Sequence, residues 1–384
     1  MLTKTIGFAL GIILFPITIL FHIYGYRHVL IFTDRIGHLA LEPDCLLKAQ
    51  YLGQLNQKKW ILLAPINRTA NEHLLTYWKH HFIVIRNRTA CFLIRNMSRF
   101  FFMRYNVKHF IRNIGKPQAA FNIYTAWGDR PPIVSLTKGD EVWGREMLAL
   151  LGLPNDAWFV CVHARESGFS PVDEELQHHR NCKIENTFDA IEEIVRRGGW
   201  VIRIGDPTMK KLPIMHNVID YAHHPLKSPR LDIILCALAR FILGNTSGIS
   251  LVGSIFGTPC ALSNMTPISA LGVSPKDISI PKLFWSHDEN RYLRFDEAIS
   301  SEIVNSQFAD NYLRLGIKLE ENSENDILNL SIEMLDQLNG RSNNDDNCII
   351  LQMSFMKLIE RHHYSYNTSS LISYRFLSKH SDLI

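Results

Sequence analysis

Short apolar runs alternate with amphipathic segments along most of the chain. Short runs bounded by Gly, Pro, Asp or Asn are typical of buried parallel strands, and the segments between them have the period of a helix. The predicted strands span residues 28–32, 60–64, 82–85, 158–163, 200–204, 218–221, 240–244 and 259–263. The helices predicted between the later strands span 184–197, 231–238 and 247–256. This alternation predicts βαβ units, and therefore parallel sheets with helices on both faces.

The strand pattern stops once in the middle of the chain and then restarts. Arg130-Pro131-Pro132 interrupts it, and it resumes after Gly152-Leu153-Pro154. We therefore predict an α/β fold of two Rossmann-like domains with an N-terminal membrane-anchor segment. The predicted segments are an anchor over 1–26, a first domain over 27–135, a linker over 136–154, a second domain over 155–340, and a linker with a helical tail over 341–384.

The amino terminus has a different pattern from the rest of the chain. Residues 6–26 contain no Asp, Glu, Lys or Arg, and about 20 such residues can cross a bilayer. Because Pro16 would kink a helix, a spanning helix and a segment lying in one leaflet are both compatible with this run. Arg27 and Arg35 follow it and favour a cytoplasmic position for the rest of the chain. A cleaved signal peptide and a buried first helix are the alternatives.

Composition limits the partners and the chemistry. The content of hydrophobic residues, 46%, is that of a folded protein, and the net charge of +4 gives no case for nucleic acid. The seven Cys are odd in number and include no C-x-x-C pair, which predicts free thiols and no zinc site.

Three predicted strands end in loops that carry reactive groups. Ligands collect at the carboxyl ends of parallel strands. The guanidinium of Arg165 suits a diphosphate, and the carboxylate of Asp206 can hold a ribose. A third loop opens a helix, whose first N–H groups bind phosphate. The residues predicted to bind the donor are His163, Arg165, Asp206, Asn245, Thr246, Ser247 and Gly248.

Each of these loops also has a purely structural interpretation. Residues 245–247 can be an ordinary helix cap, Asp206 before Pro207 a turn residue, and Arg165 with Glu166 a surface ion pair. The presence of all three loops in one predicted sheet favours a ligand site. The chain lacks G-x-G-x-x-G and the P-loop motif, and it lacks the Asp-x-Asp pair that would hold a cation on a nucleotide diphosphate. We therefore predict no metal site.

Longer motifs give a resemblance. "LCALARFILGNTSGISLVGSIFGTPCALSN" resembles the carboxyl-terminal half of two-domain glycosyltransferases of the GT-B type. Together with "RIGHLALEPD", "VCVHARES", "HRNCKIENTFDAIE", "GGWVIRIGDP" and "VIDYAHHPLKS", it resembles a family of bacterial surface-polysaccharide glycosyltransferases. The resemblance is strong from Arg35 to about Pro267. It implies polysaccharide biosynthesis and leaves the substrates unnamed. With the basic residues after the apolar run, it favours a location at the cytoplasmic face of the inner membrane.

A more distant similarity is to the heptosyltransferases. The Asp of their Arg-x-Gly-Asp turn supplies a general base. The corresponding turn here is Arg35-Ile36-Gly37-His38, which departs from that pattern because His38 takes the place of the Asp. The similarity therefore implies that Arg35 and Gly37 lie on the acceptor side and that His38 is the base. His titrates near neutral pH, and Glu42, one helical turn on, can orient or replace it. A packing or helix-start role for His38 is the alternative.

These observations predict an inverting, metal-independent glycosyltransferase. His38 or Glu42 would deprotonate the acceptor, and Arg165 would stabilise the leaving diphosphate. The donor would be a nucleotide sugar, the acceptor a cell-surface glycan or a lipid-linked molecule, and no cofactor would be needed. A sugar-nucleotide epimerase of the same fold and a non-catalytic scaffold in polysaccharide assembly are the alternatives.

Overall fold

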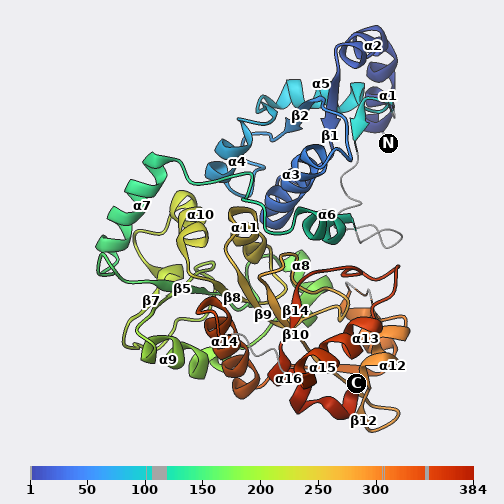
Figure 1. Cartoon of the computed structure of the whole chain (residues 1–384). Coiled ribbons are helices and arrows are strands. Elements are labelled where there is room, and N and C mark those ends of the chain that lie inside the picture. The colour runs from blue at the N-terminus through green and yellow to red at the C-terminus, as the bar shows by residue number, and fades with distance from the viewer. Residues whose placement is uncertain (1, 101, 106–118, 305, 307, 342–345) are drawn as a thin grey trace. The chain divides into compact units, whose positions relative to one another are not determined.

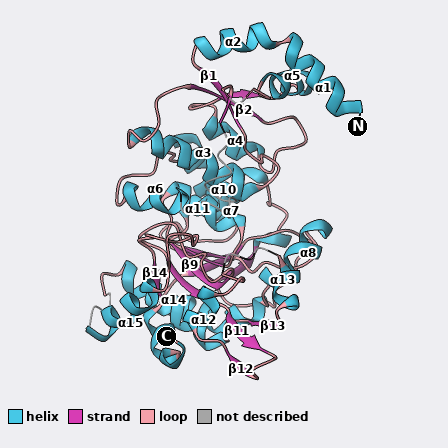
Figure 2. Ribbon diagram, turned by 90° about the vertical axis from the view of Figure 1, so that its right-hand side faces the viewer, coloured by secondary structure: helices cyan, strands magenta, loops and turns pink. Residues whose placement is uncertain are grey.

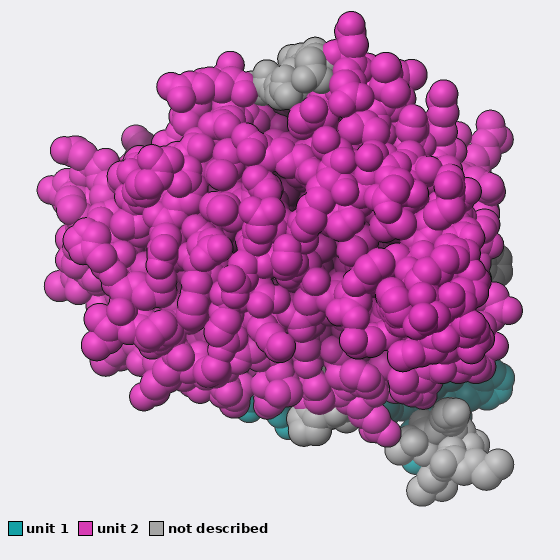
Figure 3. Space-filling view, turned by 90° about the horizontal axis from the view of Figure 1, so that it is seen from below, with its two compact units in different colours: residues 1–113 teal, residues 114–384 magenta. Residues whose placement is uncertain are grey.

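The chain forms two compact units, which comprise residues 1–113 and 114–384. The computed structural model describes residues 2–100, 102–105, 119–304, 306, 308–341 and 346–384 (Figure 1). Figure 3 distinguishes the two units by colour. Each unit contains a parallel sheet of its own. The predicted α/β fold with parallel sheets is therefore confirmed, whereas the predicted domain limits at residues 135 and 155 stay predictions.

The first unit contains three successive strand–helix repeats. Its sheet has the order β3-β2-β1-β4. The strands are β1 (Tyr26–Val29), β2 (Lys59–Leu63), β3 (Ile83–Ile85) and β4 (Arg104–Tyr105). The helices that follow the first three are α3 (Ile36–Tyr51), α4 (Glu72–Trp78) and α5 (Arg88–Met97). Strand β1 lies earlier than predicted, because the apolar run continues through residues 30–32 after the ladder has ended.

Two helices precede this sheet, α1 (Leu2–Ile13) and α2 (Phe15–Ile23). Among the described residues, no single helix has the length and hydropathy of a membrane span. Ile6–Ile13 and Phe15–Ile23 meet that criterion only as a pair, with a bend of 57° between them. The N-terminal anchor therefore stays a prediction.

The second unit is built on a seven-stranded sheet with the order β14-β10-β9-β8-β5-β6-β7. The strands are β5 (Phe159–Val162), β6 (Trp200–Arg203), β7 (Val218–Asp220), β8 (Ile242–Gly244), β9 (Cys260–Met265), β10 (Ile278–Pro281) and β14 (Leu371–Ile372). All neighbouring strands pair in parallel. Six of them follow the Rossmann order, in which the direction of winding reverses between β5 and β8. Ligands of such sheets bind at that reversal point.

Helices cover both faces of this sheet (Figures 1 and 2). On one face α9 (Phe188–Arg196) packs against α14 (Glu324–Leu338), and on the other α10 (Pro229–Leu238) packs against α11 (Gly248–Phe256) and α7 (Lys138–Leu150). Most of the predicted linker is therefore the packed helix α7. A Cβ on its Gly144 would lie 2.4 Å from Cγ2 of Ile234, so the contact needs a glycine.

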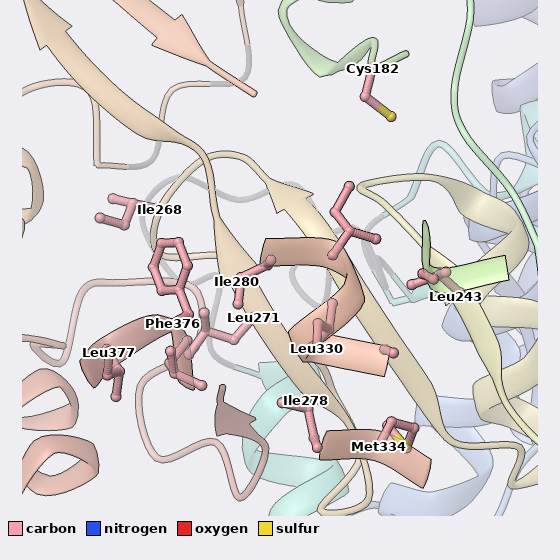
Figure 4. Close-up of a cluster of buried hydrophobic side chains, with 14 of the residues drawn as sticks. Cys182, Leu243, Ile268, Leu271, Ile278, Ile280, Leu330, Met334, Phe376 and Leu377 are labelled. Atoms are coloured by element: carbon pink, nitrogen blue, oxygen red, sulfur yellow. The ribbon is translucent and has the colours of Figure 1, made fainter. Parts of the chain in front are cut away.

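The carboxyl-terminal residues complete the second core. The segment 346–384 forms α15 (Asp346–Lys357), the edge strand β14 and α16 (Tyr374–Lys379). Figure 4 shows Phe376 and Leu377 of α16 in the same cluster of buried side chains as Ile278 and Ile280 of β10. Strand β14 consists of only two residues, too few to give a periodic signal. A small antiparallel sheet of β12 (Arg291–Tyr292), β11 (Leu283–Ser286) and β13 (Ile317–Glu320) was also not predicted.

The elements between these are short. They are α6 (Ala119–Trp127), α8 (Pro171–Gln177), η2 (His178–Arg180), η3 (Ile184–Thr187), η4 (Tyr221–His223), α12 (Phe295–Ser300), α13 (Ala309–Arg314) and η5 (Ser381–Leu383). The 3-10 segment η2 follows the loop after β5 and precedes η3. It contributes side chains to the candidate site that is described below.

Phe376→Ala should destabilise the protein strongly. Phe376 is buried in the core, and removal of a buried Phe costs about 3–5 kcal/mol through lost contacts and the cavity that remains. Chemical denaturation of the full chain measures this. The matched control is Phe169→Ala, because Phe169 is 72% exposed. Equal effects of the two substitutions would show that the tail is not part of the core.

Candidate active site

The loops after β5 and β8 meet at the reversal point of the second sheet. The backbone N–H of His163 donates to the carbonyl oxygen of Leu243 at 2.9 Å, so the two strand ends are held side by side. Asn245, Thr246 and Ser247 follow β8 directly and lead into α11. The structure therefore brings together the predicted donor residues of these two loops.

The helix α11 begins without a side-chain cap. Ser247 is at the N-cap position with extended backbone angles, but its side chain makes no capping hydrogen bond. The hydroxyl of Thr246 is engaged elsewhere, since it accepts from the N–H of Thr266 at 3.0 Å. The structural alternative, an ordinary capped helix start, is therefore not what these residues form. The first N–H groups of α11 are left to interact with water or a ligand.

Asn245 is buried and keeps one unused acceptor. Its amide nitrogen donates to the carbonyl oxygen of Arg180 at 3.0 Å, which fixes the orientation of the side chain. The remaining oxygen, Oδ1, has no hydrogen-bond partner among the described residues. A buried carbonyl without a donor is costly, so this atom is available to accept a hydrogen bond from a ligand or a water molecule.

His163 offers a second acceptor of the same kind. Its Nδ1 lies 3.1 Å from the carbonyl oxygen of Ile204, and since a carbonyl only accepts, Nδ1 carries the proton. Burial lowers the pKa of His163 to about 4, with smaller contributions from Arg203 and Arg165. The ring is therefore neutral at pH 7, and its buried Nε2, which has no partner among the described residues, is an acceptor. His163 cannot pair as a cation with a phosphate.

Three cationic side chains gather next to these acceptors. They come from the loop after β5, from η2 and from the residue after β10, and they are Arg165, Arg180 and Lys282. Arg180 Nε donates to the carbonyl oxygen of Thr246 at 3.0 Å, and Lys282 Nζ donates to that of Asn181 at 2.8 Å. Arg165 donates to the carbonyl oxygen of Gln177 at 3.1 Å and to the amide oxygen of Asn181. These bonds fix the orientation of the three side chains.

The concentration of positive charge is visible in its effect on His179. Burial, followed by the charges of Arg180 and Lys282, lowers the pKa of His179 to about 3. Lys282 is itself buried, and desolvation lowers its pKa. A partly buried group of cations of this kind favours an anionic ligand.

Arg180, His179 and Lys282 were missed from the sequence. No strand precedes His178-His179-Arg180, and Lys282 follows a short strand, so neither position had the strand-end signal used for the other loops. The only available signal was the cluster of cationic residue types at 178–180, of which His179 and Arg180 begin one of the motifs that carry the family resemblance.

Asp206 lies in the turn that follows β6. Its Oδ1 accepts from the N–H of Thr208 at 2.9 Å, as in a turn. Glu166 accepts from Arg203 at 3.3 Å, within a buried network that also includes Asp220. The predicted ribose contact of Asp206 is not tested by these bonds and stays a prediction.

In the first unit, His38 and Glu42 form a pair on the first turns of α3. His38 Nδ1 lies 2.8 Å from Glu42 Oε1. Glu42 is fully buried, whereas His38 is 12% exposed. If the carboxylate of Glu42 accepts from Nδ1–H, the lone pair is left on Nε2, as a general base requires. Arg35 is the N-cap residue of α3, and Gly37 is buried in its first turn. Roles in catalysis for these residues stay predictions.

No group of three or more His, Cys, Asp or Glu that could hold a metal ion occurs within the described ranges. All seven cysteines are free thiols in the structure, and six of them are buried.

Acid should destabilise the protein through His163. Its pKa is lower in the folded chain than the ordinary value of 6.5, so below pH 6.5 the unfolded chain binds a proton that the folded chain does not. The folded state should lose up to about 3 kcal/mol from this residue between pH 6.5 and pH 4, and no more below that. Urea denaturation of His163→Gln across this range should show a smaller loss than the parent chain. His216→Gln, at an exposed site, is the control; an unchanged pH dependence in His163→Gln would contradict the assignment.

Comparisons with known proteins gave matches among solved structures only. No family model and no curated protein matches the chain. A glycosyl transferase family 9 structure from Veillonella parvula DSM 2008 is 15% identical over 59% of this chain and 61% of its own, with a TM-score of 0.29. The chain thus spans less than two thirds of that relative.

Two further matches cover more of the chain. The dodecameric iron-containing heptosyltransferase TibC, from enterotoxigenic E. coli H10407, in complex with ADP-D-beta-D-heptose, is 13% identical over 82% of this chain and 77% of its own, with a TM-score of 0.44. A UDP-GlcNAc 2-epimerase from Methanocaldococcus jannaschii is 12% identical over 79% and 80%, with a TM-score of 0.23. Glycosyltransferases, a heptosyltransferase among them, are thus among the matched structures, as is the alternative class of epimerases. All three TM-scores are below 0.5, so the fold assignment rests on the strand order of the two sheets.

Proposed function

We propose that the chain is a glycosyltransferase that binds a nucleotide-sugar donor in its second unit. The observation that supports this most directly is the group of Arg165, Arg180 and Lys282 beside the uncapped start of α11, at the reversal point of a Rossmann-like sheet. The diphosphate of a nucleotide sugar has the negative charge and the acceptor oxygens that this group would bind.

The same group would assist the chemical step. Transfer of the sugar breaks its bond to the diphosphate, and negative charge then develops on the leaving oxygen. Fixed cations and backbone N–H groups stabilise that charge more in the transition state than in the bound donor. Because the neutral acceptors of His163 and Asn245 would repel a phosphate oxygen, we assign them to hydroxyl or N–H groups of the donor.

The first unit supplies the base in this proposal. Nε2 of His38 would take the proton of the acceptor hydroxyl, and Glu42 would hold the ring and stabilise the imidazolium that forms. The burial of Glu42 favours this orienting role over direct contact with the acceptor. Attack by a deprotonated hydroxyl on the carbon that bears the diphosphate is compatible with inversion at that carbon.

The remaining parts of the proposal concern setting and requirements. The acceptor would be a cell-surface glycan or a lipid-linked molecule of bacterial polysaccharide biosynthesis. The protein would work at the cytoplasmic face of the inner membrane, held there by its N-terminal segment. No cofactor is proposed, and no metal, because the three cations would do the work that a divalent ion on Asp-x-Asp does elsewhere.

Donor binding should depend on Arg180. The test is calorimetric titration of the full chain with UDP-, GDP-, CMP-, dTDP- and ADP-sugars. Because a hydrogen bond to a charged group contributes about 1.5–3 kcal/mol, Arg180→Ala should weaken binding of the preferred donor by about 10- to 100-fold. Arg145→Ala is the control, since Arg145 is exposed and forms an ion pair with Glu141 on its own helix. No binding of any donor by the parent chain would refute the proposal.

Turnover should depend on the His38–Glu42 pair without a change in donor affinity. General-base catalysis contributes about 10²- to 10⁴-fold, so His38→Gln should lower kcat by that factor. If Glu42 acts through His38, Glu42→Gln should cost less, and the double variant should be no slower than His38→Gln alone. Transfer to acceptor and donor Kd are measured in parallel. Additive losses in the double variant would show that Glu42 acts independently.

The alternative classes give different outcomes. An epimerase would convert free nucleotide sugar to its epimer with no acceptor present. A scaffold would bind no donor, and Arg165→Ala would then change nothing measurable. The transferase alone requires both a donor and an acceptor hydroxyl, and Arg165→Ala should abolish its transfer while the chain stays folded.

A further inference from the structure

The two units differ strongly in charge. Residues 1–113 contain 15 Lys and Arg against 4 Asp and Glu, and residues 114–384 contain 26 against 33. The formal charges are therefore +11 and −7, which the whole-chain value of +4 conceals. Three of the four acidic residues in the first unit are already engaged: Glu42 with His38, Asp44 with Lys48 and Glu72 with Arg86.

The first unit also carries an extended apolar surface on α1 and α2. Phe8, Ile12, Ile13, Leu20 and Ile23 are each more than half exposed. A contiguous exposed surface of large apolar side chains is unusual for a protein that is surrounded by water, and marks a contact with a partner or a membrane.

Helix α1 is held to α5 by a narrow strip of glycines. Gly7 and Gly11 are buried, while residues 8, 9, 12 and 13 are exposed. A Cβ on Gly7 would lie 2.5 Å from Oδ1 of Asn96, and one on Gly11 would lie 3.2 Å from the carbonyl oxygen of Asn96. The apolar helix is thus packed on the unit by one edge and turns its other sides outward.

Helix α5 places cations beside this apolar surface. Arg88, Phe92 and Arg95 recur at helical spacing and are exposed, and Arg99 follows the end of the helix. A Cβ on Gly7 would be 2.6 Å from Nη2 of Arg99, so Arg99 lies directly against α1. None of the carboxylates in the described part of the chain forms an ion pair with Arg88, Arg95 or Arg99.

We propose that this surface, made of the exposed faces of α1 and α2 and the arginines at 88, 95 and 99, docks the first unit on an anionic lipid leaflet, with both helices lying along it. The apolar side chains would enter the boundary between headgroups and acyl chains, and the arginines would bind the anionic headgroups. This deepens the proposed membrane location and does not depend on the proposed transferase activity.

The packing of α1 on α5 favours this orientation over a spanning one. If α1 crossed the bilayer while still packed, it would draw Arg95 and Arg99 toward the hydrocarbon, where a charged side chain is costly. Along the leaflet, the glycine contact and the arginine–headgroup contacts are satisfied together. A second copy of the chain would bring like charges together, and nucleic acid would leave the apolar faces exposed to water.

The test is flotation of the full chain with vesicles of phosphatidylcholine alone or of equal parts of phosphatidylcholine and phosphatidylglycerol. We expect binding to the anionic vesicles that weakens with salt. The triple variant R88Q, R95Q and R99Q should lower the partition coefficient by about 100-fold, because each cation near an anionic surface contributes about fivefold. The control neutralises three exposed arginines of the second unit, R145Q, R196Q and R314Q, and should bind as the parent does.

Two further measurements make the proposal refutable. Phe8→Ser with Ile12→Ser and Ile23→Ser should lose binding while circular dichroism shows an unchanged fold. In a Cys348→Ser background, a cysteine added before Met1 should stay reactive to an impermeant maleimide outside the vesicles. Equal binding to both vesicle types, a protected added cysteine, or tighter binding to duplex DNA than to the anionic vesicles would each overturn it. Donor titration of the same variants separates this result from the proposed transferase function.

Discussion

The parallel pairing of β5 with β8 is the constraint on which the candidate site depends. These strands are neighbours in the sheet but far apart in the sequence, and the helices after them leave on opposite faces. The ends of the two strands are therefore not covered by their own connections. His163 and Asn245 lie one residue beyond these ends. Each side chain is buried and retains an acceptor atom that receives no hydrogen bond from the described residues.

Burial has different consequences for the histidines and for the arginines at this edge. Desolvation lowers the pKa values of His163 and His179, so both rings stay neutral and add no further positive charge. Arg165 and Arg180 remain charged because a guanidinium holds its proton at any relevant pH. The side chains at this edge therefore fall into two groups: the neutral rings and the amide accept hydrogen bonds, and the cations attract an anion. A histidine that titrated near pH 7 would be partly charged and would no longer act only as an acceptor.

The sequence predicted most of what is periodic and little of what is brought together by tertiary contacts. Buried strands such as β5 and β6 were placed to within a residue or two, because four apolar residues between turn signals leave few alternatives. The loop after β8 was found because it opens a helix. Arg180 and Lys282 were not found, since their proximity follows from the positions of η2 and β10, which have no local signature. Strand β14 depends wholly on its pairing with β10.

The charge of the first unit changes the argument about partners. The mild charge of the whole chain was the reason to exclude nucleic acid, and a unit charge of +11 removes that reason. The apolar faces of α1 and α2 favour a lipid leaflet over nucleic acid. A leaflet can bury these faces and bind the arginines at once, whereas a polyanion alone can bind only the arginines. The close contact at Gly7 places the guanidinium of Arg99 against the apolar helix α1, so that both kinds of contact lie on one surface. A surface that needs both kinds of contact selects the interface between headgroups and hydrocarbon, which is also where the reactive end of a lipid-linked acceptor lies.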